Sequence, residues 1–242
     1  MNKINTILFD LDGTLLPIDM KKFEELYFKG LSARFTDLMT PSEFVAVIWS
    51  ATKAMVNDLN LITNEEAFMK ALEKTVQEQL PEYQRRFTEY YESDFDLVRN
   101  AVIETAEIHE AVETLKHKGY SLVIATNPMF PKLAIDKRIE WAGIDRDDFI
   151  YVSSFEDNHF CKPQIEFYRE ILTDIKRTPE ECIMVGNDMA EDIVSGQLGI
   201  TTFCITNHLL NKHQLPDTSD YSGTYVDFLE FVNKLPSVEV AN

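Results

Sequence analysis

The hydrophobic and polar positions of the chain form two patterns, and the first predicts strands alternating with helices. Short apolar runs predict five strands, at residues 4–9, 121–126, 148–154, 182–186 and 200–206. Stretches of helical period separate the later runs, at residues 108–118, 131–143, 163–176, 190–199 and 225–235. Strands and helices that alternate with short connections are typical of a mostly parallel sheet covered on both faces. The pattern therefore predicts an α/β fold with a Rossmann-like, doubly wound parallel sheet.

The second pattern fills residues 17–105, which read as almost wholly helical. Thr40–Glu43 and Thr63–Glu66 each have a threonine followed three residues later by glutamate, which predicts a helix that begins with a capping box. Pro81 begins a further helix. We therefore predict a Rossmann-like core made of residues 1–16 and 106–242. An all-helical cap domain, residues 17–105, is inserted after the first strand as a lid.

Polar side chains follow three of the predicted strands at their carboxyl ends: Asp10 and Asp12, Thr126 and Asn127, and Asn187 and Asp188. Lys162 lies in a loop that precedes a helix near the same rim. Ligands bind at the carboxyl ends of the strands in an open parallel sheet, so these residues are candidates for one site. Two carboxylates directly after an apolar strand need a partner. Either a positive group lies between Asp10 and Asp12, or one of them holds a proton.

Composition narrows the function classes. The chain has 242 residues, 45% of them hydrophobic, and can bury a sizeable core. Its formal net charge of −18 disfavours a nucleic-acid or anionic-membrane partner, because both need a basic surface. Three cysteines without a CxxC pair fit a reducing compartment. With no signal peptide and no run of about 18 apolar residues, we expect a cytosolic protein.

Four motifs carry a family resemblance: DLDGT (10–14), TN (126–127), KP (162–163) and GNDMAED (186–192). In this order, each at its strand end, they resemble the four motifs of the haloacid dehalogenase-like superfamily. The resemblance covers the whole chain, because the helical block sits where that family places its cap. It implies a hydrolase that removes phosphate from a small phosphorylated metabolite. We expect a monomer or small homo-oligomer.

The resemblance also implies catalytic roles. Asp10 is the candidate nucleophile, because a carboxylate can attack phosphorus and form an aspartyl-phosphate. Asp12, two residues on, is the candidate general acid and base. Lys162 supplies a positive charge for the nucleophile and the transferring oxygens, and so contributes to both catalysis and phosphate binding.

Phosphate and metal sites follow from the same resemblance. Gly13, Thr14, Thr126 and Asn127 are implied to turn the backbone around the phosphate and bind its oxygens. Asp10, Asp188 and the main-chain carbonyl of Asp12 are implied to hold Mg²⁺, which prefers oxygen ligands. Asn187 and Asp192 are expected to surround this set, with Asp192 either acting on a metal-bound water or steadying Lys162.

Other functions on the same scaffold stay open. A phosphomutase shares every core residue, and a phosphonatase would add a lysine from the cap, for which Lys53 is available. A metal-independent haloacid dehalogenase is disfavoured, because the resembling enzymes lack the acid that this chain has at Asp12. A non-catalytic phosphate-binding protein is disfavoured because all the catalytic residues are present. The cap residues considered as substrate contacts are Trp49, Lys53, Arg85 and Arg86.

Overall fold

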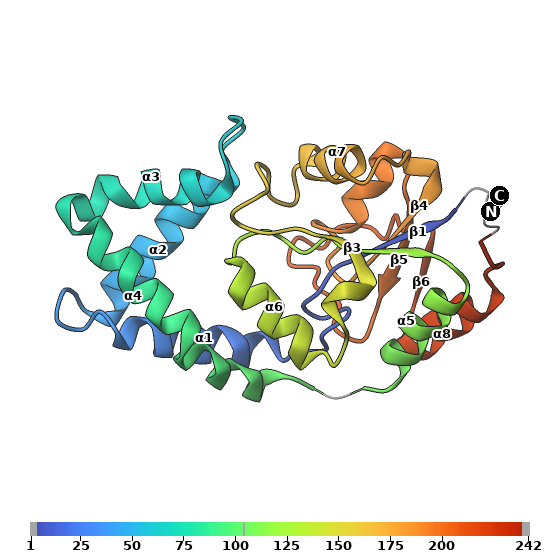
Figure 1. The fold of residues 1–242 in the computed structure, drawn as a ribbon, viewed down its shortest axis with the longest axis horizontal. Helices are drawn as coiled ribbons and strands as arrows, with labels where there is room; N and C mark the ends of the chain where they lie inside the picture. The colour runs from blue at the N-terminus through green and yellow to red at the C-terminus, as the bar shows by residue number, and fades with distance from the viewer. Residues whose placement is uncertain (1–3, 104, 239–242) are drawn as a thin grey trace.

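The structure is a computed structural model that describes residues 4–103 and 105–238 (Figure 1). Residues 1–3, 104 and 239–242, which the predicted domains include, lie outside the described residues. The α-helices are α1 (Met20–Ala33), α2 (Pro41–Val56), α3 (Asn64–Val76), α4 (Leu80–Glu92), α5 (Glu107–His117), α6 (Lys132–Trp141), α7 (Ile165–Asp174) and α8 (Tyr225–Lys234).

A parallel sheet forms the centre of the fold, as predicted. Its strands are β1 (Thr6–Phe9), β2 (Ser121–Ile124), β3 (Phe149–Val152), β4 (Cys182–Gly186), β5 (Thr201–Ile205) and β6 (Tyr221–Gly223). The order is β3-β2-β1-β4-β5-β6, and every pair is parallel. Phe9 at the end of β1 pairs with Ile124 of β2 and Val185 of β4. The loops that follow these three strands therefore begin side by side.

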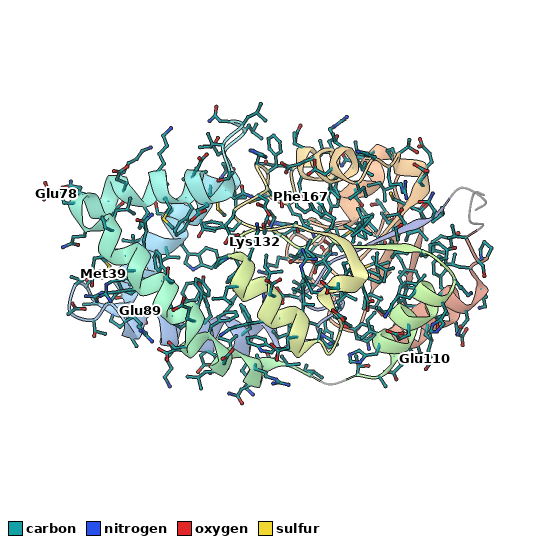
Figure 2. All side chains as sticks on the ribbon, viewed as in Figure 1. Met39, Glu78, Glu89, Glu110, Lys132 and Phe167 are labelled. Atoms are coloured by element: carbon teal, nitrogen blue, oxygen red, sulfur yellow. The ribbon has the colours of Figure 1, made fainter. Side chains whose placement is uncertain are left out.

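Helices cover both faces of the sheet, so the predicted α/β class is confirmed (Figure 1). Ile7 and Phe9 of β1 join the larger hydrophobic core, which includes Phe228 of α8. Leu8 points to the opposite face and packs in a second cluster with Phe167 of α7, labelled in Figure 2. This alternation is what a strand buried on both sides produces.

Helices α1 to α4 lie beside the sheet rather than on its faces (Figure 1). The chain enters and leaves this helical segment at one place. The Asp19 N–H donates to the Ala101 carbonyl at 2.9 Å, and the Ile103 N–H donates to the Pro17 carbonyl at 2.8 Å. The two connections are thus paired. The domain boundary at residues 17–105 stays a prediction.

The helix starts predicted in this segment are present. Thr40 and Thr63 are the N-caps of α2 and α3, and each forms a capping box with the glutamate three residues later. Pro81 lies in the first turn of α4. The segment has its own aromatic core, in which the ring centroid of Phe35 lies 4.5 Å from that of Phe44 and 4.7 Å from that of Tyr83. Its helices are therefore fixed by caps and by aromatic packing.

Two elements differ from the sequence pattern. The edge strand β6 was not predicted, because Tyr221 and Ser222 are exposed and carry no apolar run. The predicted helix at 190–199 is wrong: the structure has a 3₁₀ helix at Ile193–Leu198 instead. Within this segment the Ser195 hydroxyl donates to the Asp192 carbonyl at 2.7 Å, and such a local hydrogen bond competes with the α-helical partner of that carbonyl. Gly196 in the same segment also disfavours an α-helix.

The three cysteines are buried and form no disulfide. Within residues 4–103 and 105–238, every helix is too short or too polar to span a bilayer. The cytosolic location stays a prediction.

The capping box of α3 gives a stability prediction. Thr63→Ala removes the side chain that accepts the Glu66 N–H at 3.2 Å, and we expect the free energy of unfolding to fall by about 1 kcal/mol. Urea unfolding measures it. Lys70→Ala, at an exposed position on the same helix, is the control and should change stability by less than about 0.5 kcal/mol. Equal losses for both variants would contradict the capping role.

Candidate active site

A buried lysine stands at the centre of the residues that follow the strands. Lys162 Nζ lies 2.8 Å from Asp10 Oδ1 and 2.6 Å from Asp192 Oδ1, and its side chain is fully buried. Burial alone would lower the pKa of Lys162, but the two carboxylates raise that pKa well above its ordinary value. Lys162 is therefore a fixed cation that joins the ends of β1 and β4.

Asp10 is an acid whose charge is incompletely balanced. Burial raises the pKa of Asp10 to about 8, while Lys162 opposes this and the nearby Asp192 and Asp12 add to it. Only its Oδ1 contacts the lysine; Oδ2 has no hydrogen-bond partner among the described residues. A further cation beside Asp10 would favour its ionised form.

Asp192 anchors this charge cluster to the backbone. Its Oδ2 accepts the N–H groups of Asn187 and Asp188, both at 2.9 Å. A Cβ on Gly186 would lie 2.2 Å from the same oxygen, so the close approach requires glycine. Asp192 was predicted either to act on a metal-bound water or to steady Lys162. Its contact with Lys162 is the geometry that the second role requires.

The turn after β1 is tied to the loop after β4. Asn187 accepts a hydrogen bond from the Thr14 hydroxyl at 2.9 Å and donates to the His208 carbonyl at 2.8 Å. Gly13 has φ +88°, and a Cβ there would lie 2.4 Å from the Asn187 amide nitrogen. Tyr225 donates its hydroxyl to the Gly13 carbonyl at 2.9 Å. The DLDGT turn is thus held from two sides.

Asp188 presents one free oxygen. Its Oδ1 accepts the N–H groups of Ala190 at 2.7 Å and Glu191 at 3.0 Å, whereas Oδ2 has no partner among the described residues. Burial raises the pKa of Asp188.

Asp12 has a partner that the motifs did not include. Arg138, on α6, is 1% exposed and forms an ion pair with Asp12. Its guanidinium lies 4.6 Å from the centre of the Phe130 ring, and its Nε donates to the Ala134 carbonyl at 3.2 Å. Burial raises the pKa of Asp12, and Arg138 opposes that rise. One oxygen of Asp12 and one nitrogen of Arg138 are buried without a hydrogen-bond partner.

The sequence does contain a signal for Arg138. Ala134, Ile135 and Ile139 form the buried stripe of α6, and Arg138 occupies a position on the same stripe. An arginine at an apolar helix position must be paired when it is buried. Its partner lies 126 residues away in the chain, so only the position, and not the contact, could be read from the pattern.

Thr126 and Asn127 follow β2 at the same rim. The Asn127 amide donates to Glu191 Oε2 at 3.0 Å, and its own oxygen is buried without a partner. Glu191 was not among the predicted site residues, although it lies in the GNDMAED motif. Burial raises the pKa of Glu191 to about 7, with Lys162 opposing the rise.

A cleft of about 560 Å³ opens between these loops and helices α1 and α2. Gly13, Thr14 and Lys162 lie outside its lining, whereas Trp49 and Lys53 of α2 form part of its far wall. Arg85 and Arg86 pair instead with acidic residues of the helical segment, among them Glu89 of α4 (Figure 2). The predicted site residues that line the cleft are Asp10, Asp12, Thr126, Asn127, Asn187, Asp188 and Asp192.

The donor set fits Mg²⁺. Asp10 and Asp188 line one cleft, and their carboxylate oxygens are hard ligands of the kind this ion prefers. Within residues 4–103 and 105–238, no group of three or more histidine, cysteine, aspartate or glutamate side chains could hold a metal ion. That is compatible with Mg²⁺, which usually keeps several waters and takes one or two carboxylates plus substrate phosphate.

Comparison with known proteins identifies the family. The profile of haloacid dehalogenase-like hydrolases matches residues 4–198. The chain belongs to the haloacid dehalogenase-like hydrolase family. Its relatives include pyrophosphatase PpaX of Bacillus cereus, 27% identical over 195 residues that cover 81% of this chain and 79% of that protein.

Solved structures of this family share the fold. A predicted phosphoglycolate phosphatase from Haemophilus somnus superposes with a TM-score of 0.61 at 18% identity, covering 96% of this chain and 99% of that one. The hydrolase YfnB from Bacillus subtilis, described as bound to magnesium, has a TM-score of 0.57 at 19% identity, covering 96% and 100%. L-2-haloacid dehalogenase from Xanthobacter autotrophicus also has a TM-score of 0.57, at 14% identity, covering 96% and 99%. At these identities the likeness concerns the fold alone.

The Asp192–Lys162 contact gives a second prediction. Asp192→Asn removes one of two carboxylates that neutralise a fully buried ammonium, and we expect the free energy of unfolding to fall by about 3–5 kcal/mol. Guanidinium unfolding measures it. Asp188→Asn is the matched control, because an amide oxygen can keep accepting the Ala190 and Glu191 N–H groups. A loss no larger than that of the control would show that Lys162 does not depend on Asp192.

Proposed function

We propose that this protein is a Mg²⁺-dependent phosphatase that acts on a small phosphorylated metabolite through an aspartyl-phosphate intermediate. The observation that carries the proposal is the Asp10 carboxylate at the end of the central strand, with Lys162 on one oxygen and the other oxygen without a partner in the cleft. The names of the relatives, a pyrophosphatase and a predicted phosphoglycolate phosphatase, support phosphorus chemistry.

In the first step, the free Oδ2 of Asp10 attacks phosphorus, and the bond between phosphorus and the ester oxygen breaks. Asp12 donates a proton to that oxygen, so the alcohol leaves neutral. The raised pKa of Asp12 suits an acid that must carry a proton at the start. Arg138 holds the Asp12 side chain in place by donating a hydrogen bond to its Oδ2, which leaves Oδ1 to carry the proton.

In the second step, a water attacks the phosphorus of the aspartyl-phosphate, and Asp12 accepts the proton that the water loses. The phosphorus–oxygen bond to Asp10 breaks, which releases inorganic phosphate and restores both carboxyl groups. Lys162 stabilises the negative charge around Asp10 in both steps. Thr126 and Asn127 line the cleft, and we propose that they bind the phosphate oxygens.

The proposed magnesium ligands are Asp10, Asp188 and the main-chain carbonyl of Asp12. When bound, Mg²⁺ neutralises the transferring phosphoryl oxygens and favours the ionised form of Asp10.

Residues 17–105 are proposed to act as the cap. Their paired connections at Pro17–Asp19 and Ala101–Ile103 suit a hinge, because both ends of the segment move together. Closure over the substrate would exclude bulk water from the phosphoryl group.

Lys53 lines the cleft, which keeps phosphonate cleavage as a second candidate. In that case Lys53→Met would abolish activity on phosphonates, and an unchanged rate would remove the candidate.

Asp10 gives the main test of the proposal. Asp10→Asn removes the nucleophile and is expected to abolish release of inorganic phosphate from a panel of phosphorylated metabolites assayed with Mg²⁺. Chelation of Mg²⁺ in the wild-type preparation should have the same effect, and added Mg²⁺ should restore the rate. Asp37→Asn, at an exposed position of the helical segment, is the control and should keep full activity. Undiminished phosphate release by Asp10→Asn would refute the mechanism.

The role of Asp12 can be separated from simple structural support by the leaving group. Asp12→Asn should lower kcat/KM, which reports on the first step and not on later hydrolysis of the aspartyl-phosphate, by about 10²–10⁴-fold for an alkyl phosphate, because its alkoxide needs a proton. The loss should be much smaller for 4-nitrophenyl phosphate, whose phenolate leaves readily. Arg138→Met should show the same dependence, since it releases the Asp12 side chain. Equal losses for both substrates would argue against a general acid. Isothermal titration should show little change in Mg²⁺ affinity for Asp12→Asn.

A further inference from the structure

The cleft that contains Asp10 lies next to a second cavity that the proposed chemistry does not use. This cavity has a volume of about 310 Å³ and lies between the helical segment and the loops after β2 and β3. Tyr27, Thr52 and Met129 line both spaces, so the two adjoin at these side chains. The cleft of about 560 Å³, which contains the nucleophile in its lining, and this cavity therefore share a wall made by these three side chains.

The walls away from Asp10 are apolar and aromatic. In the cleft these side chains include Phe23, Phe28, Trp49, Val56 and Phe130. In the second cavity they include Leu31, Ile48, Phe68, Phe87, Leu133 and Phe155. The Trp49 side chain is 49% exposed, and its ring lies 5.6 Å from that of Phe28. An exposed tryptophan beside a second ring offers a surface on which an apolar or planar group can stack.

The charged residues of the cleft differ from those of the second cavity. Lys53 and Lys212 line the cleft near the acids of the loops. The charged residues that line the second cavity, among those described, are Glu65 and Glu156. These two carboxylates disfavour a second anionic group at the far end.

Size and polarity together restrict the substrate. The cleft and the second cavity each have a volume typical of sites for drug-sized ligands, about 300–1,000 Å³. Phosphoglycolate, a single phosphate with a two-carbon acid, would fill only a small part of them, and so would inorganic pyrophosphate. Both are also anionic at each end, where the second cavity is acidic. A phosphate monoester with a bulky apolar alcohol places its charge at Asp10 and its carbon atoms against the aromatic walls.

We propose that the substrate is a phosphate monoester whose alcohol portion is bulky and apolar or aromatic, lies against Trp49 and extends past Tyr27 into the second cavity. This inference rests on the proposed phosphatase function. The substrate proposed for this chain differs from pyrophosphate and phosphoglycolate, after which two similar proteins are named.

The test compares two primary-alkyl phosphates, ethyl phosphate and 3-phenylpropyl phosphate, with Mg²⁺ present. Their alcohols have similar acidity, so a difference in kcat/KM reports on the alcohol portion rather than on the chemical step. We expect 3-phenylpropyl phosphate to be preferred at least about tenfold. Inorganic pyrophosphate and phosphoglycolate should both be poorer substrates than 3-phenylpropyl phosphate. Equal or better turnover of ethyl phosphate, phosphoglycolate or pyrophosphate would overturn the inference.

Two variants locate the preference. Trp49→Ala should reduce the ratio of the two kcat/KM values by about tenfold, and Leu133→Trp, which fills the second cavity, should reduce it as well. Leu61→Ala is the matched control, because Leu61 is an 81% exposed residue of the same segment that lines neither space. A ratio that stays at the control value in both variants would also overturn the inference. Failure to release phosphate from every monoester would instead refute the phosphatase proposal on which it rests.

Discussion

The rest of the site depends on one buried ammonium group held between two carboxylates. Lys162 has no access to water, so its charge must be balanced by Asp10 and Asp192. Asp192 is in turn bound by two backbone N–H groups of the loop after β4. The charge balance therefore fixes that loop relative to the end of β1. Any arrangement that separated these two strand ends would leave a charge buried without a partner.

The parallel sheet makes this balance possible. Strand β1 lies between β2 and β4 in register, so polar residues far apart in the chain reach one rim. The rim remains rich in acids, because Asp12, Asp188 and Glu191 join Asp10 and Asp192 around the cleft. The buried cations beside them are Lys162 and Arg138. Such an excess of carboxylates suits a site whose remaining positive charge arrives with a divalent ion.

The helical segment contributes a different chemistry to the same cleft. Its walls are aromatic and apolar, while the loops of the sheet carry the charged groups. In the proposed function, the sheet therefore carries the reaction, and α1 and α2 select the alcohol. The two connections between these parts pair with each other at Ile18 and Val102.

Features that depend on neighbours within a few residues could be predicted from the sequence. The capping boxes at Thr40 and Thr63, the apolar strands and the Gly13 turn are of this kind. The strand ends also predicted which residues share the rim, because parallel strands place their carboxyl ends together. The 3₁₀ helix at Ile193–Leu198 was not predicted, because the hydrogen bond from the Ser195 hydroxyl to the Asp192 carbonyl, which competes with an α-helix, is not visible in the apolar pattern.

The sequence by itself determined the fold class, the family motifs and the rim on which the acids gather, since periodicity and motif order are properties of the chain. Only the tertiary structure decided that Arg138 pairs with Asp12, that Glu191 accepts from Asn127, and that an apolar cavity adjoins the cleft. Each of these joins segments far apart in the sequence. The partner of a buried charge is chosen by the packing that removes it from water, and no local pattern records that choice.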